Sequence, residues 1–141
     1  MSIALECIED VQAKLDALDE FGQKIFHVYS EEDLLDKATT LRLPAVGVSY
    51  GGITSEPGQD RSRQGLLGSL RVAIVLIIDS KSIGLDRKDE AAEMMDLIRC
   101  ALLGQKSPTG HKWQFLSELP MGSASGVLLY MQRWQTAAPL T

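Results

Sequence analysis

The sequence predicts an α/β (α+β) fold in which a mostly antiparallel central sheet packs against two main helices. Three observations predict it. Segments with helical periodicity alternate with segments rich in β-branched and aromatic residues, a long apolar run lies in the middle of the chain, and the last segments are strands joined by a glycine-rich turn. A chain of 141 residues is the size of one domain, so residues 1–141 are expected to form a single domain.

The first element is an amphipathic helix. Ile8, Val11, Leu15 and Leu18 recur at spacings of three, four and three residues, which places them on one stripe of a helix. We expect this helix to end near Gly22.

A strand and a short helix follow. Residues 24–29 alternate and are rich in β-branched and aromatic types, which predicts a strand. Ser30 can then cap a helix, with Asp33 at the position of the reciprocal capping partner. Leu34 and Leu35 would dock this helix on the core.

The next strand is predicted over residues 43–50 and is expected to end at Gly51 and Gly52. The chain from there to Gly65 is polar and rich in turn residues. The resulting long polar loop, 51–65, exceeds the usual connection of about 4–6 residues, so it is either mobile or functional.

Residues 70–79 are expected to form the central strand. The unbroken apolar run 72–78 indicates a strand covered on both faces. Asp86 can cap a helix that runs through Leu103, and Gly104 suits the left-handed position after its end.

The last third of the chain predicts a hairpin. Residues 113–119 are typical of an edge strand, residues 120–126 of a turn, and residues 127–136 of a final strand. Tyr130 and Trp134 would share one face of that final strand.

The charge of the chain is unevenly distributed. The net charge of −5 and pI near 5.0 argue against binding nucleic acid or anionic lipid as the main task. Residues 1–36 hold ten acidic and two basic residues, a local charge of −8, which leaves +3 on the rest. This asymmetry is either a solvated acidic helix face or a complementary patch that orients association between subunits.

We find no pattern of residues that predicts catalysis, a metal ion or a cofactor. Cys7 and Cys100 lack the spacing of a redox or zinc motif, and Cys7 is expected to be a buried hydrophobic residue. His27 and His111 have no neighbour at metal-ligand spacing.

Four short segments resemble functional motifs only superficially. Residues 122–126 have alanine where a nucleophile elbow needs serine, and residues 104–107 close a helix where a phosphate loop would open one. The acidic clusters at 31–33 and 86–90 occupy predicted helix starts, where carboxylates oppose the helix dipole.

The sequence also indicates a compartment. Two cysteines are too few for a disulfide framework, the first residues are acidic where a secretory signal needs bases, and the apolar run 72–78 is far shorter than the ~20 residues that span a bilayer. We therefore expect a protein that folds in the cytoplasm, with no membrane partner.

Several segments together resemble a known family. The segments are 43–50, the long polar loop, the apolar strand 70–79, the helix end 101–108 and the last strand ending at 130–136. Their order resembles the tail terminator proteins of long-tailed bacteriophages, in particular the Mu-like tail protein family, over nearly the whole chain.

This resemblance implies a non-enzymatic structural protein of the virion. Such a subunit would assemble as a homo-hexamer into a ring on the head-proximal end of the tail tube, end tube polymerisation and provide the head-tail joining surface. Its partners would be itself, the tail tube protein and a head-tail connector or neck protein, with DNA only in transient passage through the lumen and with assembly in the host cytoplasm. No cofactor is implied.

The candidate interface residues lie in two segments. Arg61 and Arg63 form the only basic cluster, and guanidinium groups suit ion pairing with carboxylates of a neighbour. The full set of candidates for contact with another subunit or with the tube is Glu9, Asp10, Asp16, Glu56, Asp60, Arg61 and Arg63.

Two alternatives remain open from the sequence. One is another neck or head-completion connector protein of the virion, since fold alone does not separate these roles. The other is a small cytosolic enzyme whose site would draw on Asp79, Asp86, His27 and His111, which requires those groups to converge in a pocket.

Overall fold

The computed structural model describes residues 2–21, 24–40, 43–55, 67–79, 85–124 and 126–140. One five-stranded sheet has the strand order β1-β2-β3-β5-β4, and only the β1–β2 pair is parallel. The predicted α+β fold with a mostly antiparallel sheet is confirmed. The elements are α1 (Ile3–Asp16), a 3-10 turn (Asp19–Phe21), β1 (Ile25–His27), α2 (Glu31–Thr40), β2 (Ala45–Ser55), β3 (Leu67–Asp79), α3 (Leu85–Leu102), β4 (Gln114–Ala124) and β5 (Val127–Pro139).

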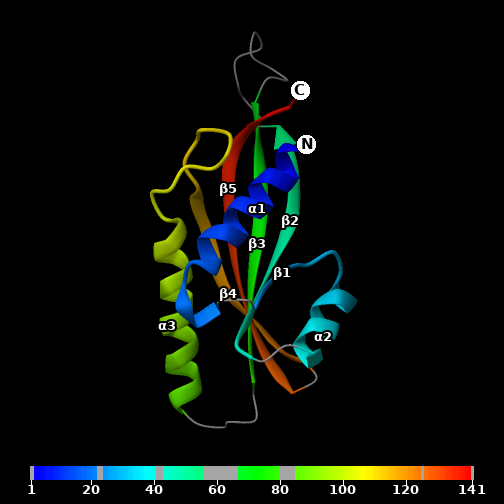
Figure 1. The fold of residues 1–141 in the computed structure, drawn as a ribbon, viewed down its shortest axis with the longest axis vertical. Helices are drawn as coiled ribbons and strands as arrows, with labels where there is room; N and C mark the ends of the chain where they lie inside the picture. Colours follow the sequence, from blue (N-terminus) through cyan, green and yellow to red (C-terminus); the bar gives the residue numbers. More distant parts are fainter. Residues whose placement is uncertain are drawn as a thin grey trace.

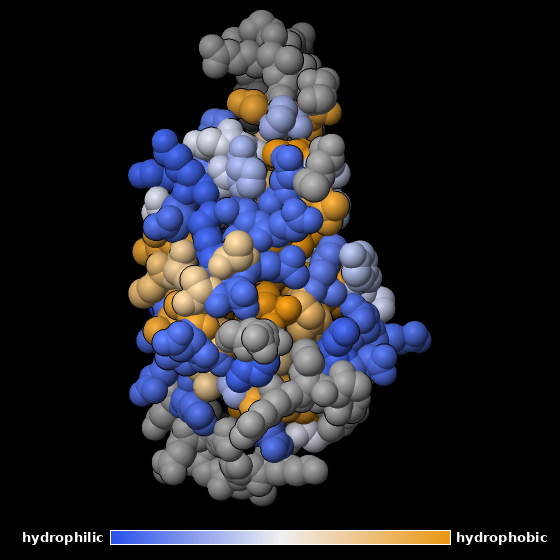
Figure 2. Space-filling view, in the orientation of Figure 1, coloured by the Kyte–Doolittle hydropathy of each residue, from blue (hydrophilic) through white to orange (hydrophobic). Residues whose placement is uncertain are grey.

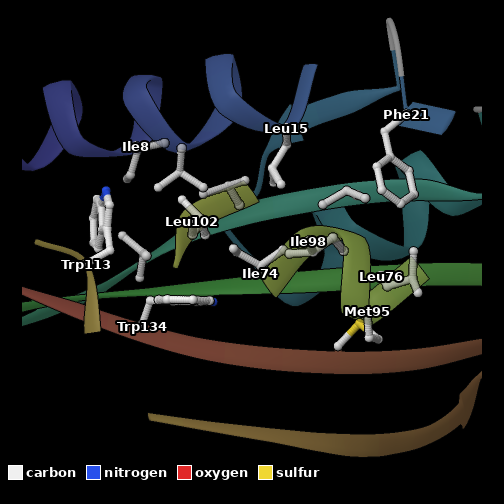
Figure 3. Packing of buried hydrophobic residues seen from close by; sticks show 14 of the residues in the cluster. Ile8, Leu15, Phe21, Ile74, Leu76, Met95, Ile98, Leu102, Trp113 and Trp134 are labelled. Atoms are coloured by element: carbon white, nitrogen blue, oxygen red, sulfur yellow. The ribbon is translucent and has the colours of Figure 1, made fainter. Parts of the chain in front are cut away.

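The sheet separates two hydrophobic clusters. α1 crosses one face of the sheet with α3 beside it (Figure 1), and the larger cluster lies beneath these two helices. Figure 3 shows α1 and α3 side chains meeting those of the sheet in this layer. The smaller cluster lies on the opposite face, where Leu34 of α2 packs with residues of β2, β3 and β5. We call this second side the α2 face.

β3 lies in the middle of the strand order, as predicted from its apolar run. Ile74 and Leu76 belong to the larger cluster, whereas Val75 and Ile77 belong to the smaller one. Because successive side chains of a strand point to opposite faces, the unbroken apolar run reflects burial on both sides.

The predicted end of β2 at Gly51 and Gly52 is wrong. β2 continues to Ser55 and pairs with β3, with a register shift between Tyr50 and Ile53. Gly52 adopts a φ of 95°, which glycine tolerates, so the two glycines form a bulge within the strand and do not terminate it. The predicted loop 51–65 is therefore strand over 51–55, and residues 56–66 lie outside the described part of the chain.

The predicted turn at 120–126 is also wrong over most of its length. β4 runs to Ala124 and shifts register between Pro120 and Gly122. β4 is an edge strand, and proline, which lacks an N–H donor, is tolerated at edge positions and bulges. Gly126, with a φ of 82°, is the turn glycine that precedes β5.

Helix boundaries differ from the predictions by a few residues. α1 ends at Asp16 and a 3-10 turn follows, where the sequence predicted a continuous helix to near Gly22. α3 begins at Leu85, so Asp86 lies inside its first turn and is not the residue that precedes it. The predicted left-handed Gly104 is confirmed by its φ of 80°.

The capping of α2 follows the predicted pattern with one shift. The Ser30 hydroxyl accepts from the Asp33 N–H at 3.1 Å. The Asp33 carboxylate accepts from the N–H of Tyr29 at 3.2 Å, one residue before the expected partner.

Within the described ranges, none of the helices combines the length and the apolar character that crossing a membrane requires.

Candidate subunit interface

Two of the predicted interface acids lie on the outer side of α1. Glu9 and Asp16 are exposed, as is the intervening Ala13, whereas Cys7, Val11 and Leu15 are buried against the sheet. The helical period of 3.6 residues produces this separation. Figure 2, viewed from the α1 side, shows hydrophilic residues across the middle of this surface.

The third acid of α1, Asp10, is engaged within the subunit. It is partly buried, forms an ion pair with Lys14, and accepts from Trp113 Nε1 at 3.1 Å. Lys14 also donates to the backbone carbonyl of Lys106 at 3.0 Å. Asp10 thus ties α1 to the segment between α3 and β4.

The other four predicted interface residues, Glu56, Asp60, Arg61 and Arg63, lie outside the described residues. The strands that flank them are described: Ser55 of β2 pairs with Gly68 of β3.

The structure reveals two arginines that the sequence prediction missed. Arg71 of β3 and Arg133 of β5 are exposed on the α2 face, the same side as Val75 and Met131. Arg71 pairs with Gln135, and Arg133 pairs with Ala73, so the two arginines are diagonal neighbours across adjacent strands.

A hollow of about 280 Å³ lies at these arginines, and Gly51, Ala73 and Met131 also line it. The sequence signal was present, because Arg71 is the one basic residue of β3 and Arg133 is the one charged residue of β5. Only the pairing of β3 with β5 shows that they are neighbours.

A larger hollow of about 480 Å³ continues on the same face, between α2 and the sheet. Its lining is mainly apolar and includes Leu34, Leu129 and Met131. Tyr29 and Met121 at this hollow are 80% and 47% exposed. Large side chains left exposed to this degree around one hollow are typical of a surface that contacts another protein.

The groups proposed for an enzyme site do not converge. Thr136, which pairs with Leu70 at one end of β3, donates to the carbonyl of His111 at 3.3 Å. Asp79 ends β3 nine residues further along, a separation of about 30 Å for a strand. His27 lies on β1, beside Val48 in the first half of β2. The side chain of Asp86 is outside the described part of the structure.

Across the residues that the structure describes, no three histidine, cysteine or carboxylate side chains gather in a way that could hold a metal ion.

A buried polar network joins α3 to the sheet. Trp134 Nε1 donates to Gln132 Oε1 at 2.9 Å, and Gln132 Nε2 donates to the Met95 carbonyl and to Glu118 Oε1, both at 2.8 Å. Arg99 of α3 donates to the same Glu118 oxygen at 3.0 Å, and hydrogen bonds to Glu118 and Asp96 raise the pKa of Arg99. Each buried side-chain polar atom in the described part of the chain has a partner, so this network is structural.

The two cysteines should differ sharply in reactivity. Cys7 is fully buried, and burial, with smaller contributions from Asp10 and Glu6, raises the pKa of its thiol to about 11 from 9.0. Cys100 is exposed. We expect a thiol reagent at pH 8 to titrate one cysteine in the folded protein and both in denaturant, because the attacking species is the thiolate. Rapid modification of Cys7 in the folded protein would contradict its position under α1.

Comparisons with known proteins agree with this architecture. No family model matches the sequence, and no curated protein matches it. A solved chain of the virion of native gene transfer agent (GTA) particle is similar along nearly its whole length, with a TM-score of 0.60, 16% identity and 98% of each chain covered. The protein shares its fold with this virion chain. A second solved structure, whose name gives no function, matches with a TM-score of 0.52, 9% identity and 96% of each chain covered.

Proposed function

We propose that this chain is a structural protein of a virion, and specifically a tail terminator. In this role it forms a hexameric ring on the head-proximal end of the tail tube, ends tube polymerisation and provides the surface that joins the head. The observation that carries the proposal is the full-length similarity in fold to a chain of the gene transfer agent virion. The order of segments that resembles the tail terminator family supports the more specific role.

The distribution of charge on the subunit supports assembly into a ring. Exposed Glu9 and Asp16 lie on α1, on one side of the sheet, and exposed Arg71 and Arg133 lie on the strands of the other side, which also carries the exposed acids Glu32 and Asp36 of α2. A subunit with different, complementary surfaces on opposite sides associates head to tail, and a head-to-tail arrangement closes into a ring when the rotation permits.

The overall charge is compatible with a lumen through which DNA passes. Binding to DNA depends on neutralising phosphates with lysine and arginine, and the chain carries a net charge of −5. We therefore propose that DNA only passes through the ring. The proposed partners are further copies of the chain, the tail tube protein and the neck protein, and the proposed location is the head-proximal end of the tail.

The proposal requires no chemistry from the subunit. His27, His111 and Asp79 lie on separate parts of the described structure, so they do not form the convergent site that the enzyme alternative needs.

A connector or head-completion protein is the second candidate. The same observation favours it, because the similarity to a virion chain concerns the fold and not the position within the particle.

Electron microscopy of particles produced without this protein separates the two candidates. For a tail terminator we expect overlong tubes and unjoined heads, since nothing stops tube growth. Tails of normal length beside leaking heads would contradict this role and support the connector. Normal particles in normal number would contradict both.

A further inference from the structure

We propose that the outer side of α1 in one copy docks on the α2 face of the next copy, with Glu9 and Asp16 opposite Arg71 and Arg133. This inference rests on the proposed ring, and it names the surfaces through which the subunits of that ring meet. It differs from the sequence prediction, which placed the basic partner at Arg61 and Arg63.

The strands of the acceptor surface carry two exposed arginines, and α2 covers this side of the sheet only in part, with its own exposed acids Glu32 and Asp36. Arg71 and Arg133 are exposed diagonal neighbours. Because like charges on neighbouring strands repel, an anionic partner that contacts both would relieve the repulsion. Among the described strand residues of this face, the only carboxylate is Asp79, at the opposite end of β3 from Leu67. Carboxylates that pair with these arginines can therefore come from a second molecule.

Apolar side chains surround the arginines on the same face. Leu119 of β4, which pairs with Met131, is 58% exposed, and Met121 is 47% exposed. With the hollows of about 280 and 480 Å³, these residues form a recessed surface that combines apolar area with two guanidinium groups. Interfaces between proteins have this composition, with arginine and methionine enriched.

The outer side of α1 fits that surface in chemistry and in size. Leu5, which is 37% exposed, and the exposed Glu9, Ala13 and Asp16 form one stripe along the helix. The stripe presents two carboxylates around a small residue, and a helix of 14 residues is about 21 Å long, which suits an open strip of a sheet. The α1 helix carries four carboxylates and one lysine, a net charge of −3, which adds long-range attraction to the arginines.

The two surfaces lie on opposite sides of one sheet, so the contact is directional. Each copy offers a donor helix on one side and an acceptor face on the other, and this arrangement propagates from copy to copy. A two-fold dimer would instead bring the same surface of both copies together, helix against helix or sheet face against sheet face, and would set like charges against each other.

Charge exchange between the surfaces tests the inference. One variant carries Arg71→Glu and Arg133→Glu, and the second carries Glu9→Lys and Asp16→Lys. Sedimentation velocity measures association of each variant alone and of an equimolar mixture. For each variant alone, we expect the concentration at which half of the chains associate to rise about tenfold or more, because like charges then face each other. The mixture should recover it, because acidic sheet faces then meet basic helices and basic sheet faces meet acidic helices in alternation.

The matched control reverses two exposed charges outside both surfaces, Glu93→Lys with Lys112→Glu, and should associate as the unmodified chain does. Circular dichroism checks that each variant is folded. Association of either variant at the level of the unmodified chain, or a mixture that fails to recover, would overturn the inference. So would an unmodified chain that stays monomeric at all concentrations, and so would an effect seen only on binding to the tube protein. The association measurements test only which surfaces meet. The tube lengths of particles made without the chain test the proposed function, so the two can fail separately.

Discussion

Replacing Trp134 with alanine is expected to lower the free energy of unfolding by about 3–5 kcal/mol, the usual cost of removing a large buried aromatic side chain. Trp134 is fully buried between the sheet and the helical layer (Figure 3). Its ring packs edge-on against Phe115, with 5.4 Å between centroids, and its N–H donates to Gln132. The variant therefore loses packing and leaves the Gln132 carbonyl without its partner. Urea denaturation followed by circular dichroism measures the change.

Leu103→Ala is the control for this measurement. Leu103 is 58% exposed, so its truncation should change the free energy of unfolding by less than about 0.5 kcal/mol. A loss of less than about 1 kcal/mol for Trp134→Ala would contradict the position of this residue at the centre of the core.

Replacing both Arg61 and Arg63 with glutamate is expected to reduce assembly, since the resemblance in sequence proposes these residues as a further contact with a neighbouring subunit or with the tube. The flanking strands β2 and β3 pair up to Ser55 and Gly68, on either side of the segment that holds these arginines. Guanidinium groups there are suited to carboxylates of a neighbouring subunit or of the tube, and reversal of both charges turns attraction into repulsion. Light scattering measures assembly.

Lys112→Glu, an exposed reversal on a different segment, is the matched control and should assemble normally. Unchanged assembly together with unchanged tail length for the double arginine variant would show that this segment does not take part in the interface. The two arginine pairs make independent predictions, because Arg71 and Arg133 belong to β3 and β5, whereas Arg61 and Arg63 belong to the segment between β2 and β3.

The local patterns in the sequence were sufficient to predict most elements. The apolar run 72–78 predicted a central strand because burial on both faces removes alternation, and β3 has this position. Ser30 and Asp33 predicted the start of α2 because capping depends on neighbours in sequence.

The strand ends could not be predicted in the same way. Gly51, Gly52 and Pro120 are turn residues by type, yet each lies within a strand at a register shift. Whether such residues end a strand or form a bulge depends on the partner strand, which continues to pair on the far side. The sequence alone does not show which strand is that partner.

The candidate interface was predictable only in part. The acidic outer side of α1 follows from helical periodicity, and Glu9 and Asp16 lie there. Asp10 differs because its carboxylate accepts a hydrogen bond from Trp113 of the same subunit, a residue that is far away in the sequence. Arg71 and Arg133 become a pair only through the register of β3 against β5, and the incomplete cover of their face depends on where α2 packs.

The most direct test of the proposed function is the length of tail tubes as a function of the amount of this chain. Tube protein would be assembled in extracts of cells that lack the chain, with the purified chain added back at increasing concentration, and tube lengths would be measured by electron microscopy. We predict overlong tubes in its absence, a single shorter length once the chain is supplied, and the chain located at one end of each tube. Tube lengths that do not respond to the chain would contradict its role as a tail terminator.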